Sequence, residues 1–232
     1  YFLVFDDRKK RLDKQFAIYL RNQRENTSVG FASPMREERR TLLGQYGIRY
    51  PLDIFTSVRA TATLRQDRLI QLATDANSLN IPFINEQRAG IKLEYVFDNT
   101  LDVSINIKNG TRYKVFTEIV KSFNVEVFDE FKLDFNEGIL GIIGLDARHY
   151  QRLDKHSILA VRAAGATSFG TEKILYYLGG VDNWLFPSFN DEIPQPTGGD
   201  FAFQTLAANL RGFRQNIRNG NSYALINTEL RV

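Results

Sequence analysis

Polar and apolar side chains alternate with a period of two along most of this chain, and this pattern constrains the fold more than any other feature. In one segment the apolar residues Val58, Ala60, Ala62 and Leu64 alternate with Arg59, Thr61, Thr63 and Arg65. Successive side chains of a β-strand point to opposite faces, so such a segment has one apolar and one polar face. The same pattern recurs at 91–97, 101–108, 130–135 and 224–231. The sequence therefore predicts an all-β protein, with a short helix over Asp67–Ala76 as a local alternative.

The length of the apolar runs bears on how such a chain meets a membrane. The longest candidate, Ile139–Leu145, contains two glycines and is far shorter than the roughly 20 apolar residues of a membrane-spanning helix. A helical membrane protein is excluded, but a barrel is not, because only alternate residues of its strands face lipid. Soluble β-sandwiches and lipocalin-like barrels also alternate. Charges of both signs on the polar faces and segments of about ten residues favour an antiparallel transmembrane β-barrel.

The connections between the alternating segments are of two kinds. Short ones are expected at Pro51–Asp53, Asn109–Gly110 and Gln151–Lys155, and long polar ones at 22–38, 67–88 and about 168–221. Short turns on one side and long loops on the other are typical of outer-membrane barrels. Asn109–Gly110 also fits a type I′ hairpin turn, so Leu101–Lys108 is either a strand or part of a wider turn. No internal repeat or low-complexity linker divides the chain, which predicts one domain over 1–232.

Composition and charge exclude several other functions. The 30 basic and 27 acidic residues give a net charge of +3 and are spread along the chain, which argues against nucleic-acid binding. There is no cysteine, and the two histidines, His149 and His156, stand in no arrangement that suits a metal or a Ser–His pair. We therefore expect no enzyme activity, no metal and no cofactor. The single tryptophan, Trp184, is expected to pack within its loop.

The last third of the chain carries an ordered set of motifs. Leu178-Gly179-Gly180 is followed after a long loop by Leu210-Arg211-Gly212-Phe213, and then by a segment ending in Glu229-Leu230-Arg231. This set resembles the outer-membrane assembly-factor or bacterial surface antigen superfamily, which includes BamA and TamA. Gly144–Tyr150 and Ser157–Ala166 look like the two strands that precede this loop, and the resemblance covers about 88–232. Phe97–Thr100 and Asn109–Arg112 resemble Bacteroidota proteins that join a TolB-like propeller to such a barrel.

The resemblance implies a role for each of these residues. The long loop, about 168–221, would fold back into the barrel lumen, with Arg211 as the cation at its tip and Glu229 as a candidate partner on the inner wall. The alternation agrees, because it places Glu229 on the polar face of its segment, opposite Ile226 and Leu230. Gly212 would permit close backbone approach or a positive φ, and Phe213 would anchor the tip against the wall.

The resemblance also implies a location and a function. We expect part of a larger barrel in the bacterial outer membrane that takes part in protein assembly or translocation. Its partners would be outer-membrane lipid, lipopolysaccharide and other outer-membrane or periplasmic proteins. Two departures from the family are that no POTRA-like repeats precede the barrel segment and that its closing strands would lie beyond Val232. The alternatives are a barrel that only anchors or scaffolds a surface or secretion complex, and a soluble β-rich binding domain.

The predicted ion pair gives a first test. Replacement of Arg211 by alanine would leave its carboxylate partner unpaired in a partly dehydrated lumen, at a cost of about 3–5 kcal/mol. We expect the folded Arg211→Ala protein to convert to its unfolded form at a lower temperature on semi-native gels. Unchanged mobility and melting would argue against the lock.

Overall fold

A computed structural model of the chain describes residues 2–8, 11–27, 35–72, 84–104, 107–126, 132–135, 138–180, 201–210 and 212–232. Every regular element in these ranges is a β-strand, so the prediction of an all-β protein is confirmed. Within the same ranges, no helix has the length and apolar character needed to cross a membrane.

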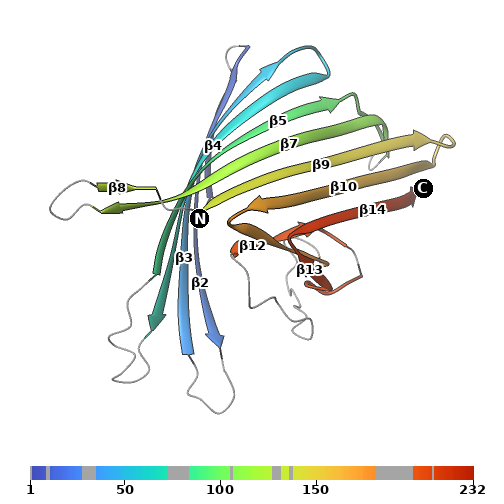
Figure 1. Cartoon of the computed structure of the whole chain (residues 1–232). Coiled ribbons are helices and arrows are strands. Elements are labelled where there is room, and N and C mark those ends of the chain that lie inside the picture. The colour runs from blue at the N-terminus through green and yellow to red at the C-terminus, as the bar shows by residue number, and fades with distance from the viewer. Residues whose placement is uncertain are drawn as a thin grey trace. The chain divides into compact units, whose positions relative to one another are not determined.

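Most of the strands belong to one large sheet (Figure 1). Its eleven strands follow the order β1-β2-β3-β4-β5-β7-β9-β10-β14, with β6 and β8 each paired to β7. These strands are β1 (Phe2–Asp7), β2 (Asp13–Thr27), β3 (Met35–Pro51), β4 (Thr56–Leu72), β5 (Ile84–Asp98), β6 (Leu101–Ser104), β7 (Ile107–Glu126), β8 (Lys132–Asp134), β9 (Ile139–Arg152), β10 (Ile158–Gly170) and β14 (Ser222–Arg231). A smaller sheet holds β11 (Lys173–Leu178), β12 (Phe201–Ala208) and β13 (Arg218–Gly220) in the order β12-β11-β13.

Contacts divide the chain into two compact units. The first unit comprises 1–50, 60–92 and 120–137, and the second comprises 51–59, 93–119 and 138–232. Strands β4, β5 and β7 each contribute one portion to each unit. Within the first unit β2 pairs with β1 and β3, and within the second β10 pairs with β9 and β14, in each case antiparallel.

In the first unit, the apolar residues of neighbouring strands share one face. Phe16 pairs with Tyr46 and Leu20 with Leu42. Ala17, the residue after Phe16, belongs to the opposite face. The apolar face lies at the surface, since Phe16, Leu20, Leu42 and Tyr46 are all more than 40% exposed. Alternation has therefore produced a sheet whose large apolar side chains are not packed in a dry interior.

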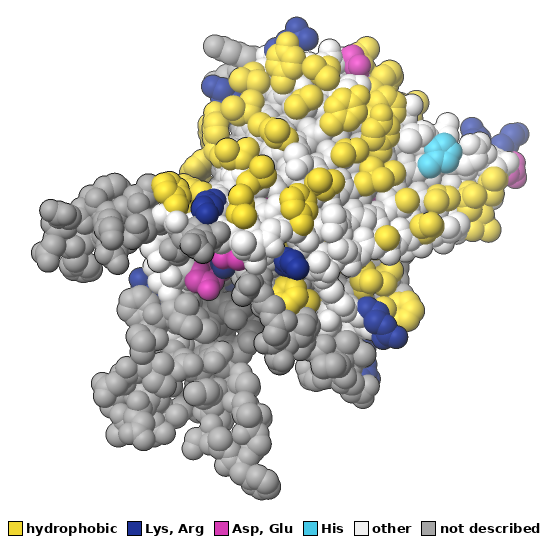
Figure 2. Space-filling view, viewed as in Figure 1, with side chains coloured by type: hydrophobic (Ala, Val, Ile, Leu, Met, Phe, Trp, Pro, Cys, Tyr) yellow, Lys and Arg dark blue, Asp and Glu magenta, His cyan; other side chains and the backbone are white. Residues whose placement is uncertain are grey.

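The second unit shows the same separation of faces. Along β14 the exposed and half-buried residues alternate strictly, with Ile226 76% and Leu230 64% exposed. Glu229 belongs to the other set, as the sequence pattern predicts, and lies opposite Ala160 of β10. Figure 2 shows hydrophobic side chains gathered over a broad area of one face of the molecule.

The buried core of the second unit lies on its non-apolar face, where the small sheet contacts β9, β10 and β14. The ring of Tyr176 in β11 lies 5.0 Å from that of Tyr223 in β14, and Ser168 Oγ accepts a hydrogen bond from Ile174 N and donates one to Asn221 O. The buried apolar residues of the second unit are Leu140, Ile142, Ile158, Ala160, Ala164, Ala166, Ile174, Leu175, Tyr176 and Ala208. The sequence analysis predicted no strands within 168–221.

The predicted short turns at 51–53 and 151–155 are confirmed. Strand β3 ends at Pro51 and β4 begins at Thr56, and β9 and β10 are separated by 153–157. The first turn is organised by Asp53, whose Oδ1 accepts hydrogen bonds from the backbone N–H groups of Phe55 at 2.7 Å and Thr56 at 2.6 Å. The bond from Phe55 above all holds the pKa of the exposed Asp53 carboxyl below its ordinary value.

Three expectations for the other connections are wrong. Strand β4 continues to Leu72, so the helix alternative fails over 67–72, and 73–76 lie outside the described residues. The strands are also longer than about ten residues, because β2, β3, β4 and β5 extend into regions that were expected as loops. Asn109–Gly110 is not a hairpin turn but lies within β7, where Gly110 adopts a φ of +112°. Of the two alternatives left open for Leu101–Lys108, the wider turn agrees with the structure, because Leu101–Ser104 is a short arm that pairs back onto β7 and not a full strand of the sheet.

Candidate functional site

The carboxylate of Asp146, on the polar face of the second unit, is bonded by two arginines. Arg162 donates to it from Nε at 3.2 Å and Nη2 at 2.9 Å, and Arg148 donates from the same two atoms at 3.2 Å each. The strand register explains this geometry, because Arg148 lies directly opposite Arg162 and Asp146 is two residues along β9 on the same face. Two forked guanidinium groups around one carboxylate form a rigid, charge-assisted cluster.

Other acidic groups on the polar face are also flanked by basic ones. In the second unit the carboxylate of Glu94, only 7% exposed, lies 3.9 Å from Arg59 and 3.6 Å from Lys114. In the first unit Asp67 is bonded by Arg65 Nε at 2.6 Å and by the hydroxyl of Thr41 at 2.7 Å. The polar face thus carries many charges of both signs that are balanced locally, a surface suited to contact with water or with a polar chain.

Histidines and metal ligands form no comparable cluster in the part of the chain that the structure describes. No group of three or more His, Asp or Glu side chains there is arranged to hold a metal ion. His149 lies exposed on the apolar side of β9, with Nδ1 2.8 Å from the hydroxyl of Thr111. His156 lies in the turn between β9 and β10. The expectation that the chain is not an enzyme stays a prediction.

The structure brings together two of the motifs that carry the family resemblance. Leu210 N donates to Gly180 O at 3.0 Å, and Gly180 N donates to Phe213 O at 3.1 Å. A third bond, from Phe213 N to Leu210 O at 3.4 Å, closes a four-residue turn with Gly212 at its third position. Gly212 has a φ of +85°, in the left-handed region that favours glycine. Arg211, the second residue of this turn, lies outside the described residues.

Gly179 is under a tighter constraint than Gly212. Its φ is +111°, and a side chain at this position would collide with the backbone carbonyl of Arg214. The neighbouring residue, Leu178, accepts a hydrogen bond from Ile217 N at 2.9 Å, which holds the two backbones close together. At Gly212, by contrast, a Cβ atom would have open space around it. The requirement for glycine at 179 is therefore both conformational and steric.

The predicted lock also includes Glu229, Arg211 and Phe213. Glu229 accepts two hydrogen bonds from Arg231, from Nε at 3.0 Å and Nη2 at 2.8 Å, and the Arg231 guanidinium lies over the ring of Tyr150 at 5.8 Å. A contact between Glu229 and Arg211 stays a prediction because Arg211 is not described. Phe213 is 57% exposed, so its role as an anchor also stays a prediction. Trp184 lies outside the described residues.

Comparisons with known proteins found no matching protein-family model, no matching curated protein and no matching solved structure. The resemblance to the assembly-factor superfamily therefore rests on the motifs alone.

Sequence reasoning missed the cluster around Asp146. It noted that the polar faces carry charges of both signs but did not pair any of them. The available signal was the short turn at 151–155, because an antiparallel hairpin with a known turn fixes which residues lie opposite each other.

The two glycines give a matched pair of variants. Gly212→Ala should cost about 1–2 kcal/mol, since only the positive φ is unfavourable there. Gly179→Ala adds a collision with a backbone carbonyl, so the segment around it must shift, and protection of the Gly180 amide from hydrogen exchange should be lost. Protection factors in the two variants, measured by hydrogen exchange, check this. Equal effects would contradict the geometry of Gly179.

Proposed function

We propose that this chain forms part of the wall of a β-barrel in a bacterial outer membrane and takes part in the assembly or translocation of proteins there. The observation that carries the proposal is the exposure of the apolar face. On successive strands this face presents large apolar side chains that are not covered by the rest of the protein. Soluble monomers rarely expose contiguous apolar patches of more than a few hundred Å². A lipid-facing barrel wall requires such a surface. Exposed members of this face include Phe16, Leu20, Leu42, Tyr46, Leu64, Ile91, Leu93, Val115, Ile119, Ile143, Leu145, Ile226 and Leu230.

The length of the apolar stretch fits a bilayer. On β4 the outward residues are Val58, Ala60, Ala62 and Leu64, and the next two on this face, Gln66 and Arg68, are polar. The ten residue steps from Thr56 to Gln66 span roughly 33 Å along the strand. At a strand tilt of about 40° this corresponds to roughly 25 Å, the height of the apolar band of an outer-membrane barrel. Gln66 is hydrogen-bonded at 2.9 Å to Asn85 of β5, so the polar boundary continues onto the next strand.

Aromatic rings gather at the end of the second unit that carries the short turns. The ring of Phe97 lies 6.4 Å from Phe55 and 5.1 Å from Tyr113, and Tyr113 lies 6.3 Å from Tyr95. Phe55 immediately precedes β4, and Phe97 is near the end of β5. Trp and Tyr are enriched at membrane–water interfaces, and aromatic girdles flank the apolar band of such barrels. The cluster supports the placement of the short turns at one membrane surface.

The opposite face supports a water-filled lumen. Groups such as Asp146 and Glu94 would be costly beside acyl chains but are stable where water and paired guanidinium groups surround them. The part of the proposal that concerns client proteins is supported by the resemblance of Leu178–Gly180, Leu210–Phe213 and Glu229 to the assembly-factor motifs. The hydrogen bonds that join the first two motifs agree with their acting as one structural element.

A second candidate, a barrel that only anchors other domains, is favoured by the small sheet. Residues Leu140, Ile142 and Tyr176 are buried where this sheet covers the polar face, and such packing suits a static wall better than an open passage. Two measurements follow. The first tests the membrane location, and the second distinguishes a barrel that assembles or translocates proteins from one that only anchors other domains.

The first measurement tests the membrane face with adjacent residues of β4. Ala62→Arg would place a charge on the apolar face, near the middle of the proposed band, and should cost about 2–4 kcal/mol of folding free energy in a bilayer. Thr63→Arg, on the polar face, should fold normally. Folding into phospholipid vesicles is followed by protease protection and semi-native gel mobility. Equal folding of both variants, or a protein that is fully soluble without detergent, would refute the membrane assignment.

The second measurement tests activity. The full-length protein in proteoliposomes should accelerate the folding or passage of an unfolded outer-membrane protein by at least severalfold over empty vesicles. An anchor would give no acceleration even though it inserts correctly, and that result would select the second candidate.

A further inference from the structure

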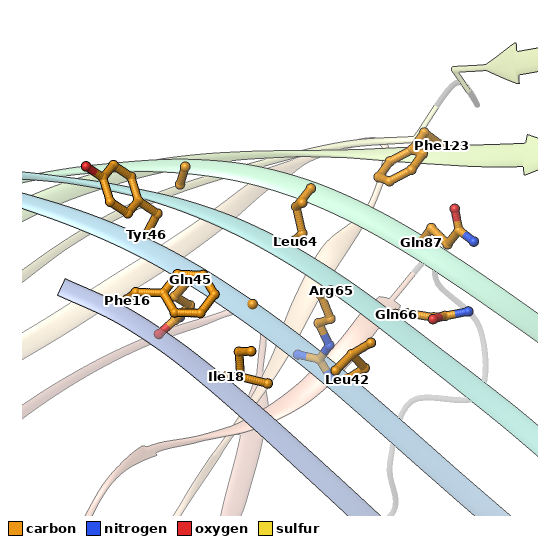
Figure 3. Close-up of a pocket in the computed structure, with 12 residues that line it drawn as sticks. Phe16, Ile18, Leu42, Gln45, Tyr46, Leu64, Arg65, Gln66, Gln87 and Phe123 are labelled. Atoms are coloured by element: carbon orange, nitrogen blue, oxygen red, sulfur yellow. The ribbon is translucent and has the colours of Figure 1, made fainter. Parts of the chain in front are cut away.

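A shallow groove with a volume of about 480 Å³ lies on the apolar face of the first unit (Figure 3). It is formed around Gly44, which has no side chain to fill the space between its neighbours. A Cβ atom at Gly44 would meet nothing closer than the carbonyl oxygen of Leu64, at 4.0 Å. The apolar side chains that line the groove are Phe16, Ile18, Leu42, Tyr46, Ala62, Leu64 and Phe123.

The groove has a direction. In Figure 3 Phe16 and Tyr46 lie toward one end, Leu64 and Leu42 near the middle, and Gln66 and Gln87 toward the other end. The strand register gives the same order, because the cross-strand pair of Phe16 with Tyr46 is followed by Ile18 with Gly44 and then Leu20 with Leu42. The next pair on this face joins Asn22 and Arg40, where the apolar residues end.

A second hollow, of about 750 Å³, continues from the polar end of the groove and shares Leu42 and Gln66 with it. Of the described basic residues that line it, Arg40 and Arg68 belong to the apolar face, whereas Arg21 lies opposite Thr41 on the polar face; none of the described lining residues is acidic. Arg40 also donates to the buried carboxylate of Glu38 at 2.7 Å, which fixes the position of its guanidinium. An apolar groove thus leads directly into a positively charged hollow.

We propose that this composite site binds one anionic membrane lipid, with an acyl chain in the groove and a phosphate-bearing headgroup at the arginines. Charge and shape both select this occupant: a free phosphate ion would leave the apolar groove empty, and a neutral lipid would not use the guanidinium groups. The inference rests on the proposed membrane location.

The depth of the site fits one leaflet of a bilayer. The six residue steps from Phe16 to Asn22 span roughly 20 Å along the strand. At a tilt of about 40° this is roughly 15 Å of depth, a little more than half of the apolar band of roughly 25 Å. A lipid whose chain lies along the groove would therefore have its headgroup at the level of Arg40 and Arg68.

The test uses the full chain folded in detergent, with dioleoyl phosphatidylglycerol and dioleoyl phosphatidylcholine as probes and native mass spectrometry as the readout. The wild-type protein should retain one phosphatidylglycerol in preference to phosphatidylcholine. Gly44→Leu fills the groove and should lower retention about tenfold, the effect of losing contact with about two methylene groups. Arg68→Gln should lower it about fivefold.

Two control variants separate the site from general effects. Ala147→Leu adds three carbon atoms to the apolar face of the second unit, one fewer than Gly44→Leu adds to the first, and Lys92→Gln removes a charge from the polar face of the first unit; both should retain lipid as the wild type does. Wild-type retention by Gly44→Leu, equal retention of the two lipids, or competition by inorganic phosphate alone would overturn the proposal. A protein that folds in detergent but retains no lipid refutes only this inference, whereas one that needs no detergent refutes the membrane location as well.

Discussion

The backbone hydrogen bonds between neighbouring strands are the interaction on which the rest of this structure depends. Because each strand pairs through its backbone, side chains are free to alternate between two faces that meet different surroundings. In hydrocarbon an unpaired N–H or C=O group costs several kcal/mol, so only helices and closed sheets can cross a membrane. In the order of the large sheet β1 and β14 are the terminal strands. The barrel proposal therefore requires that both of these edges be paired in the membrane.

The two faces of the sheet differ in how many charges they carry and in how those charges are paired. The apolar face carries few charges along the central part of each strand, and the polar residues Asn22 and Gln66 follow the apolar stretches of β2 and β4. The polar face carries charges throughout, but its carboxylates are matched by guanidinium or ammonium groups in the same or a neighbouring strand. At Asp146 the cross-strand register alone brings two arginines to one carboxylate, so the pairing needs no loop to position the side chains.

The features that sequence analysis predicted correctly are those set by local patterns. Alternation gave the strands, the apolar face and the parity of Glu229, and turn residues gave the connections after Pro51 and Arg152. Sequence-based prediction failed where the side-chain pattern does not follow the backbone structure. The next outward residues after Leu20 and Leu64 are the polar Asn22 and Gln66, so the alternation is interrupted there although β2 and β4 continue to Thr27 and Leu72. Gly110 resembles a turn residue because positive φ suits a turn, but within β7 the same φ is accommodated in a strand.

The small sheet was beyond the reach of local reasoning. Strands β11 and β12 are parallel and far apart in sequence, and β13 is only three residues long, so no alternating segment announces them. The contacts between the motifs could not be predicted for the same reason. The hydrogen bonds of Gly180 with Leu210 and Phe213 join residues about thirty positions apart. Motif order can suggest that such residues belong together, but only the fold gives their contacts.

The ring contact between Tyr176 and Tyr223 has a consequence for how the sheet edge behaves. It couples the docking of the small sheet to the order of β14, whose far edge is turned away from β10. Energetic coupling of this kind is reciprocal. Whatever strand pairs with that edge will also strengthen the docking of the small sheet, and any force that lifts the small sheet away will loosen the edge for a new partner.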